Sequence, residues 1–234
     1  MTAASLRVWD LPTRLFHWGL VLAVGGALAT AWIPGIAIEW HARCGYAVLA
    51  LLLFRLAWGL VGGHWSRFSA WRPSPARLWA DLRGRLHPHD RIGHSPLGTL
   101  SVIAILSLLA VQVGTGLIGD DEIAFTGPLN RFVSTATGLA ATGWHKELGK
   151  LLVIALIVLH VTAIAYYALV RRIALVGPMV HGNKPLDVLG LPASGQVDLP
   201  PSRDDGRSRL LALVLAAGSV AVVAWVAGLA ASSG

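Results

Sequence analysis

Two histidines lie in one of the most apolar stretches of the chain, WHKELGKLLVIALIVLHVTAI, residues 144–164. An ionisable side chain inside such a segment is costly and by default marks a functional site. His145 and His160 are separated by ~22 Å along an α-helix and by about 60° of rotation beyond four full turns. Both imidazoles therefore lie on nearly the same side of the helix. Because a metal–nitrogen bond is only about 2 Å long, the spacing predicts two separate sites.

Each site needs a second ligand at a matching depth, from another apolar segment. His41 begins a second segment at the level of His145, and His17 lies near the start of a first segment, in the half that contains His160. We therefore predict two pairs on facing helices, His41 with His145 and His17 with His160, because helical bundles commonly build cofactor sites in this way. His94, at the mouth of a later segment, is an alternative to His17.

The chemistry of these pairs favours haem over zinc. Zinc sites usually have three or four protein ligands, whereas two histidines fill both axial positions of a haem iron and leave none for O₂. This ligation favours electron transfer. The chain has no CxxCH motif, so we predict two b-type haems, bound without covalent attachment.

Glycine follows two of the histidines by four residues, at Gly45 after His41 and at Gly149 after His145. One turn along the same face, a missing side chain would let a flat macrocycle approach the backbone. Glycine also serves ordinary helix packing in membranes, and that explanation stays open.

Arg55 is a basic residue well inside an apolar segment, in LLLFRLAWG. Such a residue either faces a partner within the bundle or extends to the membrane surface. We expect the propionates of a haem near His160 to be its partner, and Arg14 is a second candidate for the same role.

The histidines and Arg55 lie in or beside apolar segments that are long enough to cross a ~30 Å hydrocarbon core. Of the 234 residues, 55% are hydrophobic and only 13% are charged, which is typical of a membrane protein. A single cysteine, Cys44, excludes a disulfide framework and an iron–sulfur cluster built within this chain. The fold class is therefore predicted to be an all-α integral membrane protein. The predicted spans are residues 13–33, 41–61, 96–118, 145–171 and 209–230.

The basic residues predict the orientation of the chain, because cytoplasmic loops carry an excess of arginine and lysine. The loop 63–95 contains six arginines and two aspartates, whereas the loop 119–144 contains three acidic residues and Arg131 alone. We therefore predict a multi-pass protein of the bacterial inner membrane with a cytoplasmic N-terminus and a periplasmic C-terminus. In this orientation His41 and His145 form the outer pair, and His17 and His160 the inner pair.

The first four spans are expected to form one main domain, to which a linker and a fifth span are added. Residues 1–184 are expected to form a four-helix transmembrane bundle around the haems, residues 185–208 a cytoplasmic linker, and residues 209–230 a fifth transmembrane helix. Asp10 and His17 make the first segment unlike a signal peptide, so we expect it to be retained.

Four motifs, in order along the chain, carry a family resemblance. They are VWDLPTRLFHW, HARCGYAVLALLLFRLAWG, GHSPLG and WHKELGKLLVIALIVLHVTAIAYY. Together they resemble the bacterial cytochrome b561 and nickel–iron hydrogenase cytochrome b subunit family, over about residues 7 to 184.

The resemblance implies a four-helix bundle with two b haems, which moves electrons between a partner redox protein and the membrane quinone pool. It also implies that His17, His41, His145 and His160 are the iron ligands, in agreement with the pairs predicted from depth. The chain departs from the family pattern in PMVHGNKP, where His181 and Asn183 stand at positions expected to be Thr and Arg.

Two other functions stay open. A self-sufficient oxidoreductase would take electrons from a small molecule such as superoxide or quinol, without a partner protein. A histidine-lined metal-ion transporter would be colourless. The acidic start of the loop 119–144 could serve as a docking surface, and the cytoplasmic mouth near Arg14, His17, Arg55 and His94 is the expected quinone site.

Overall fold

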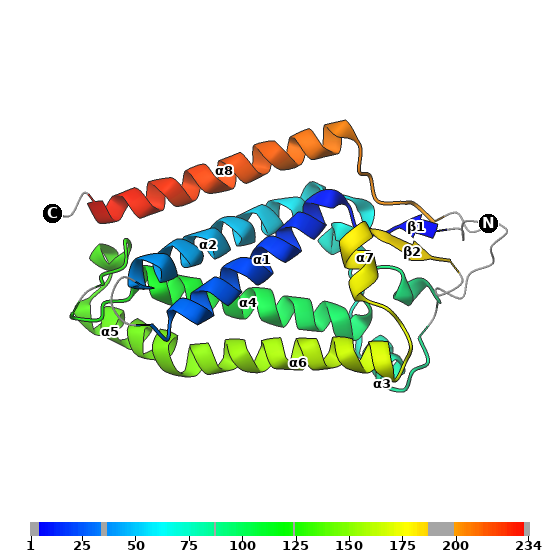
Figure 1. Cartoon of the computed structure of the whole chain (residues 1–234), viewed down its shortest axis with the longest axis horizontal. Coiled ribbons are helices and arrows are strands. Elements are labelled where there is room, and N and C mark those ends of the chain that lie inside the picture. The colour runs from blue at the N-terminus through cyan, green and yellow to red at the C-terminus, as the bar shows by residue number, and fades with distance from the viewer. Residues whose placement is uncertain (1–4, 34–36, 87, 124, 187–198, 232–234) are drawn as a thin grey trace. The chain divides into compact units, whose positions relative to one another are not determined.

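The computed structural model describes residues 5–33, 37–86, 88–123, 125–186 and 199–231. Nearly all regular structure in these residues is helical, with one short two-stranded sheet (Figure 1). Five helical segments are long and apolar enough to cross a membrane. They are Leu11–Thr30, Ile38–Val61, Pro96–Ile118, Thr135–Leu169 and Gly206–Ala230. The prediction of an all-α membrane protein is confirmed.

The long helices are α1 (Leu11–Thr30), α2 (Ala37–Val61), α4 (Pro96–Ile118), α6 (Lys150–Leu169) and α8 (Gly206–Ala231). The short elements are β1 (Ser5–Arg7), α3 (Pro75–Leu82), α5 (Thr135–Trp144), α7 (Val176–His181) and β2 (Asn183–Pro185). Short 3₁₀ turns cover His64–Ser66, Phe68–Ala70, Pro88–Arg91 and Asn130–Phe132.

The largest difference from the predicted spans concerns the fourth, which was expected to begin at His145. Helical structure begins ten residues earlier in α5, where the Ser134 side chain accepts a hydrogen bond from the backbone N–H of Thr137. A π-helical turn, His145–Gly149, then joins α5 to α6. Because α5 contains Gly138 and Gly143, which lower helix propensity, its sequence gave little helical signal. His145 thus lies within a continuous helical segment.

The chain forms two compact units, and each contains parts of the long helices. The first unit comprises residues 1–15, 55–104 and 158–213, and the second comprises residues 16–54, 105–157 and 214–234. Each unit is described by itself below.

In the first unit, β1 pairs antiparallel with β2, so that Leu6 lies opposite Lys184. The buried side chains of Leu6, Val8, Trp9, Trp65 and Ile92 form the core beside this ribbon. Gly182, with a φ of 91°, ends α7, and its carbonyl accepts hydrogen bonds from the N–H groups of Val8 and Trp9. A residue with a side chain would be strained in this conformation.

Lys184 fixes the loop that precedes α4. Its Nζ donates to the carbonyl oxygens of Arg91 and Gly93, at 3.0 and 3.3 Å. Burial lowers the pKa of the Lys184 ammonium to about 8, because the charged form loses hydration there.

Asp10 holds the beginning of α1 in the first unit. Its carboxylate is 0% exposed and accepts hydrogen bonds from Thr13 N, Ser66 Oγ, Gly63 N and Trp58 Nε1. The bond from Thr13 N is an N-cap, which satisfies one of the unpaired N–H groups of the first helical turn. A buried carboxylate is tolerated here because both of its oxygens are hydrogen-bonded.

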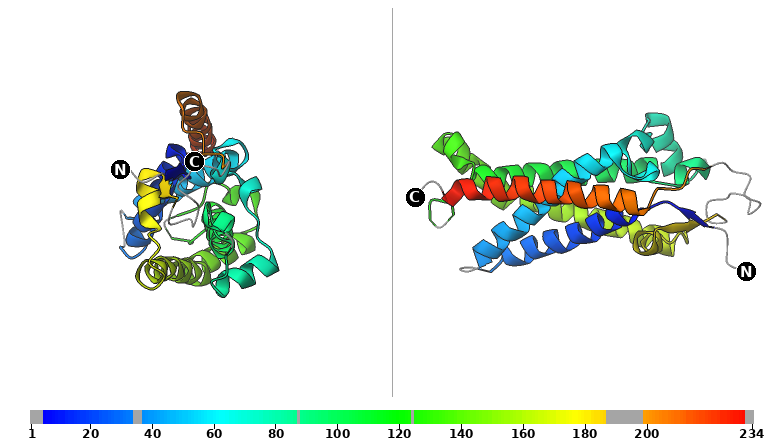
Figure 2. Two further views of the ribbon diagram at one scale, coloured as in Figure 1. Left: turned by 90° about the vertical axis from the view of Figure 1, so that its right-hand side faces the viewer. Right: turned by 90° about the horizontal axis from the view of Figure 1, so that it is seen from above.

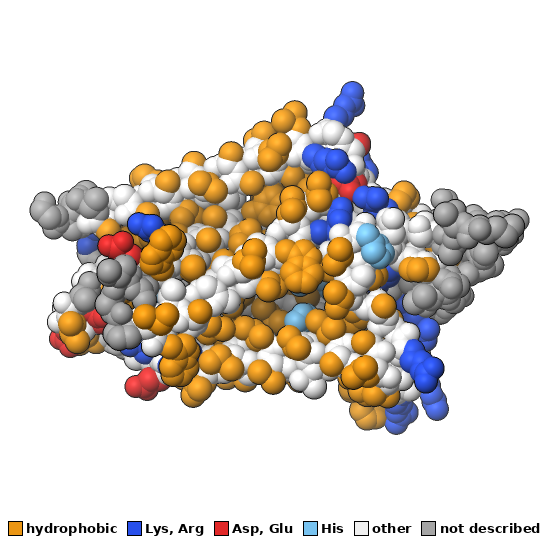
Figure 3. All heavy atoms as spheres, in the orientation of Figure 1, with side chains coloured by type: hydrophobic (Ala, Val, Ile, Leu, Met, Phe, Trp, Pro, Cys, Tyr) orange, Lys and Arg blue, Asp and Glu red, His pale blue; other side chains and the backbone are white. Residues whose placement is uncertain are grey.

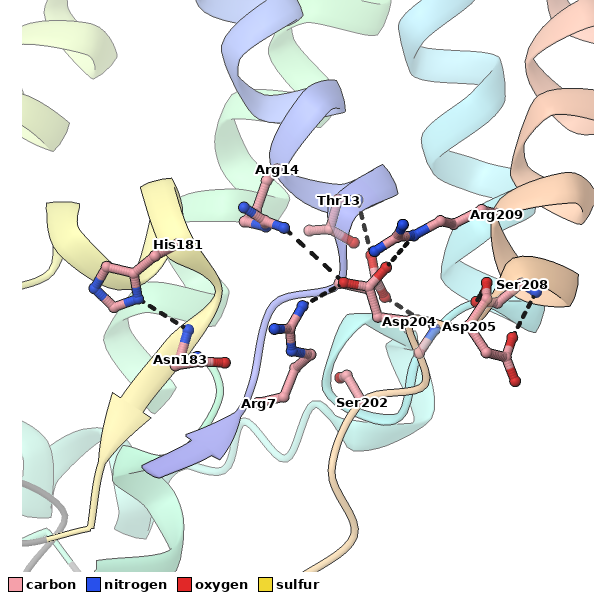
Figure 4. A network of polar contacts seen from close by, with 12 residues as sticks. Arg7, Thr13, Arg14, His181, Asn183, Ser202, Asp204, Asp205, Ser208 and Arg209 are labelled. Carbon is pink, nitrogen blue, oxygen red and sulfur yellow. Dashed lines mark hydrogen bonds and ion pairs between the residues drawn. The ribbon is translucent and has the colours of Figure 1, made fainter. Parts of the chain in front are cut away.

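A second carboxylate, Asp204, connects the start of α8 to the N-terminal segment (Figure 4). It pairs with Arg7, with Arg14 at 3.9 Å and with Arg209 at 3.0 Å. Burial opposes ionisation of Asp204, but hydrogen bonds from Arg209, the N–H of Leu11 and Arg7 outweigh it and lower the pKa of the carboxyl group. Asp204 lies in the segment 199–205, part of the predicted linker; residues 187–198 of that linker are outside the described residues.

In the second unit, segments of α1, α2, α4 and α6 run alongside one another (Figure 2). Their buried contact consists of Val48, Leu52, Leu109 and Val153, with partly buried apolar side chains packed around them. The C-terminal part of α8 also belongs to this unit, where Arg131 Nη1 donates to the carbonyl of Leu229 at 3.2 Å.

Candidate cofactor-binding site

The second unit brings two of the predicted ligands together. The ring centres of His41 and His145 are 5.8 Å apart, and the ring planes are inclined by 84°. His41 lies in the first turns of α2, and His145 is the first residue of the π-helical turn. Residues 104 positions apart in the chain thus face each other in the predicted manner.

Backbone carbonyls fix the orientation of both imidazoles. His41 Nδ1 is 2.9 Å from the carbonyl oxygen of Ala27 on α1, and His145 Nδ1 is 2.8 Å from that of Gln112 on α4. A carbonyl can only accept, so each Nδ1 carries the proton and donates it. Each Nε2 is then the nitrogen with a free lone pair, as in histidines that bind a metal.

The π-helical turn at His145 brings in a further contact. Gln112 Nε2 donates to the carbonyl oxygen of His145 at 2.8 Å, so this one residue of α4 holds both the ring and the backbone of His145. Single π-helical turns inside α-helices are rare and occur frequently at functional sites. The turn and Gln112 together set where the imidazole lies.

The two glycines that follow the histidines have different surroundings. Nothing lies within 4 Å of a Cβ built on Gly45, which lines the cavity described below. A Cβ on Gly149 would overlap Gln112 Oε1 and would lie 2.7 Å from Trp144 Nε1. Gly149 therefore makes room for the side chain that holds His145.

A cavity of about 560 Å³ lies in the second unit, with His41 and His145 in its wall. Binding pockets for organic ligands are typically about 300–1,000 Å³ and mainly apolar. Most lining residues are apolar and come from α1, α2, α4 and α6, for example Val24, Val113 and Val153. The cavity thus has the size, lining and paired nitrogens of a cofactor site.

Two lysines supply positive charge at this cavity. Lys146 and Lys150 both line it. Lys146 Nζ is 3.7 Å from a carboxylate oxygen of Asp121, and Lys150 Nζ lies 4.7 Å from the centre of the Trp32 ring. Lys150 is therefore available to an acidic group on a bound ligand, whereas Lys146 would have to leave Asp121 to serve one.

The sequence did not indicate Gln112, Gly116 or Ala27 as parts of this site. A Cβ on Gly116 would be 3.1 Å from the His145 ring, so glycine permits the ring to lie against α4. A signal was present, because Gln112 is a polar residue within an apolar span and such residues are commonly functional. Ala27 contributes only its carbonyl oxygen, which no residue type reveals.

The other predicted pair is divided between the units. His17 belongs to the second unit, where its ring packs edge-on against that of Trp18 with the ring centres 5.1 Å apart. His160 is half-buried and belongs to the first unit. The ligation of an iron by His17 and His160 stays a prediction.

Three predicted residues of the first unit have defined surroundings. Arg55 is 3% exposed, lies over the rings of Phe68 and Trp71 at 4.8 and 5.5 Å, and its Nη1 has no hydrogen-bond partner among the described residues. Arg14 donates to the carbonyl of Val180 and approaches Asp204.

His94 packs against two tryptophans, with ring centres 4.6 Å from Trp9 and 5.8 Å from Trp71. It also lines a small cavity of about 20 Å³ together with Arg72, Asp90 and Thr99. This space is much smaller than the one beside His41 and His145.

Comparison with known proteins gives the family. The family model described as prokaryotic cytochrome b561 matches residues 8–182, three quarters of the chain. The chain belongs to the prokaryotic cytochrome b561 family. It is therefore a multi-pass membrane protein that binds haem b and transfers electrons.

Two relatives have the same degree of similarity to this cytochrome. Each is described as a probable Ni/Fe-hydrogenase 1 B-type cytochrome subunit, one from Escherichia coli (strain K12) and one from Escherichia coli O157:H7. The identity is 23% over 214 residues, covering 77% of this chain and 91% of each relative. No solved structure gives a significant match.

Proposed function

We propose that this cytochrome holds two b haems and transfers electrons across the bacterial inner membrane, between a partner redox protein and the quinone pool. The observation that carries the proposal is the facing pair of His41 and His145. Both rings are oriented by backbone carbonyls, and both line an apolar cavity.

The geometry of this pair fits a haem between the rings. Two metal–nitrogen bonds of about 2 Å, with about 1 Å from each nitrogen to its ring centre, require ring centres roughly 6 Å apart. The observed separation is 5.8 Å. The donor set also fits, because each histidine offers Nε2 while its Nδ1–H is held by a carbonyl.

When bound, haem b supplies a one-electron iron couple, and the residues of this chain determine how it is held. His41 and His145 would each supply an imidazole nitrogen to the iron, and a pair of histidine ligands favours electron transfer over O₂ binding. The apolar lining excludes water, and Lys146 and Lys150 would neutralise the propionates. Gln112 would keep His145 in register through the backbone of the π-helical turn.

For the second haem we propose His17 and His160 as ligands. Arg55 supports an anionic group nearby in the first unit, because it is buried and its Nη1 has no hydrogen-bond partner among the residues that the structure describes. A buried cation normally has a partner, and the haem propionates would supply one.

The direction across the membrane follows from charge. We propose that the arginine-rich loop 63–95 and the N-terminus are cytoplasmic, and that the acidic loop 119–134 and the C-terminus are periplasmic. The hydrogenase-related name of the two relatives supports a redox protein as the partner, and the acidic loop is its proposed docking surface.

The decisive experiment is an absorption spectrum of the purified protein, oxidised and dithionite-reduced, with haem counted per chain. We expect two low-spin b haems, one of which is lost in His41→Ala and the other in His160→Ala. His181→Ala, on the exposed side of α7, is the matched control and should keep both. A colourless protein, prepared with adequate haem, would contradict the proposal and favour the metal-transport alternative.

The quinone site is proposed at the cytoplasmic mouth near Arg14 and His94. Arg14→Gln and His94→Gln should slow quinone reduction while both haems stay bound. Unchanged quinone kinetics in both variants would exclude this position. Rapid reduction of the purified chain by superoxide, without a partner protein, would support the self-sufficient oxidoreductase instead.

A further inference from the structure

The short helix α3, Pro75–Leu82, exposes its apolar residues and buries its acidic one. Trp79 and Leu82 are 56% and 62% exposed, whereas Asp81 is 4% exposed. An amphipathic helix on a water-exposed surface has the opposite arrangement, with its apolar stripe toward the core. The outward face of α3 is therefore suited to an apolar environment.

Asp81 is buried because it anchors α3 to two membrane spans. Its carboxylate accepts a hydrogen bond from the N–H of Leu97, in the first turn of α4, at 3.1 Å, and another from the hydroxyl of Tyr167, in the last turn of α6, at 3.2 Å. Helix α4 begins at Pro96 and α6 ends at Leu169. These contacts place α3 at the level where two spans end, which is the membrane–water interface.

Arginines surround the C-terminal end of α3. Arg83 and Arg85 follow it directly, and Arg83 Cζ lies 4.5 Å from the centre of the Trp79 ring. Gly84, with a φ of 68°, permits close approach of Arg171, because a Cβ there would be 2.9 Å from its guanidinium nitrogens.

Within the described part of the chain, the ion pairs include none of Arg83, Arg85, Arg171 or Arg172. Basic side chains lie beside apolar ones on the visible face of this end of the first unit (Figure 3). This end of the first unit therefore combines unneutralised positive charge with exposed apolar surface.

We propose that α3 and these arginines form a binding surface for anionic phospholipid headgroups. The guanidinium groups donate to the lipid phosphate, for which their planar donor geometry is well suited. Trp79 and Leu82 enter the boundary between headgroups and acyl chains, where Trp is commonly found. The surface thus holds anionic lipid beside the first unit, independently of the haem sites.

The test measures binding of single phosphatidylglycerol or phosphatidylcholine molecules to the haem-loaded full chain by native mass spectrometry. Phosphatidylglycerol should bind more tightly than phosphatidylcholine. In the double variant Arg83→Gln/Arg85→Gln the affinity for phosphatidylglycerol should fall about 30-fold, because each arginine near an anionic lipid contributes roughly 1 kcal/mol to binding. The control is Arg43→Gln/Arg203→Gln, which removes two exposed arginines that already pair with Glu39 and Asp205.

Equal affinity for the two lipids, or an equal loss in both double variants, would overturn the proposal. Displacement of phosphatidylglycerol by millimolar inorganic phosphate would also overturn it, because the surface would then be a free-phosphate site. The haem content of each variant is measured as a check that it is folded. Because none of the substituted arginines is a proposed haem ligand, this check also separates the lipid test from the test of the proposed function.

A second measurement tests the depth of α3 directly. A nitroxide label at position 82 of a Leu82→Cys variant, in a Cys44→Ser background, is placed in phosphatidylglycerol-containing nanodiscs. Its collision rates with oxygen and with a water-soluble nickel chelate should indicate the headgroup–acyl boundary. The same label in Arg203→Cys, at a 68% exposed side chain, is the aqueous control. Equal accessibility of both labels to the nickel chelate would overturn the proposal.

Discussion

In the first unit, the carboxylate of Asp10 accepts hydrogen bonds from four groups, two of them side chains of other segments. In the second unit, His41 and His145 each use one ring nitrogen for a backbone carbonyl, and their other nitrogens belong to the wall of a cavity of about 560 Å³. The cavity beside His94 in the first unit is only about 20 Å³.

This difference separates anchoring from ligand binding. A polar group whose hydrogen-bonding capacity is used up by the chain holds segments together, and its loss costs stability. A group that is held firmly but retains a free lone pair beside open apolar space is prepared for a ligand. Substitutions in the two units should therefore have different consequences.

The largest expected effect is at the ligands of the second unit. His145→Ala removes an axial nitrogen and should abolish haem binding at that site, so that haem per chain falls by one in reduced-minus-oxidised spectra. His64→Ala, in a loop of the first unit, is the comparison. Retention of a full complement of low-spin haem in His145→Ala would show that the cavity is not the cofactor site.

The next effect is at the anchor of the first unit. Asp10→Asn places an amide nitrogen, itself a donor, among four hydrogen-bond donors. It should lower the free energy of unfolding by about 3 kcal/mol, because a buried charge-assisted network is broken. For a chain of this size the thermal midpoint should fall by about 10 °C. The haem held by His41 and His145 should keep its spectrum below that midpoint. Equal stability of the variant and wild type would contradict the anchoring role.

A smaller effect is expected at Gln112, whose side chain holds the backbone of a proposed ligand. Gln112→Leu removes the hydrogen bond to the His145 carbonyl and should weaken haem affinity by about tenfold, the lower end for residues that orient metal ligands. Competition for haem with apomyoglobin measures this change. Ser107→Ala, at an exposed position of α4, should have no effect. An unchanged affinity in Gln112→Leu would mean that the side chain of Gln112 is not needed to position His145, whose ring is still held by the backbone carbonyl of residue 112.

The smallest effect is expected at Asp204, and it should depend on pH. Its pKa is lowered in the folded protein, so its contribution to stability is fully present above the unfolded value of about 3.8 and is lost as the pH falls through the folded pKa. At pH 7 Asp204→Asn should lower the free energy of unfolding by roughly 1 kcal/mol and therefore the thermal midpoint by about 3 °C. Below pH 3.8 the difference from the wild type should be smaller. Glu122→Gln, at an exposed position outside this network, is the control. A difference that is constant with pH would contradict the role of the Asp204 charge.

The sequence was sufficient for the number of long apolar helices and for the proximity of His41 and His145. Apolar runs of about twenty residues have few alternatives to crossing a bilayer, and an ionisable residue within them is rarely accidental. Two such residues at equal depth on different spans are therefore expected to meet. The family resemblance pointed to the same residues, and the chain does belong to that family.

Two other features were not predicted, the start of the fourth helical segment and the orientation of α3. The fourth helical segment begins at Thr135 because Ser134 caps it and α5 continues through a π-helical turn, although its glycines disfavour a helix. Residues 75–82, which form α3, were treated in the sequence only as part of the loop 63–95. Contacts with Leu97 and Tyr167, which are distant in the chain, show that the carboxylate of Asp81 faces inward.

By itself, the sequence determined the solvent and the chemistry of this protein: a bilayer, crossed by apolar helices with histidines at matched depths. The tertiary structure alone decided which nitrogen of His41 and His145 is free, which glycine opens the cavity and which one accommodates Gln112. The physical reason is that hydropathy and residue type are local properties. The direction of a lone pair is set by backbone carbonyl oxygens on other helices. Every residue type has the same backbone carbonyl, so residue type does not reveal which carbonyl will accept the hydrogen bond.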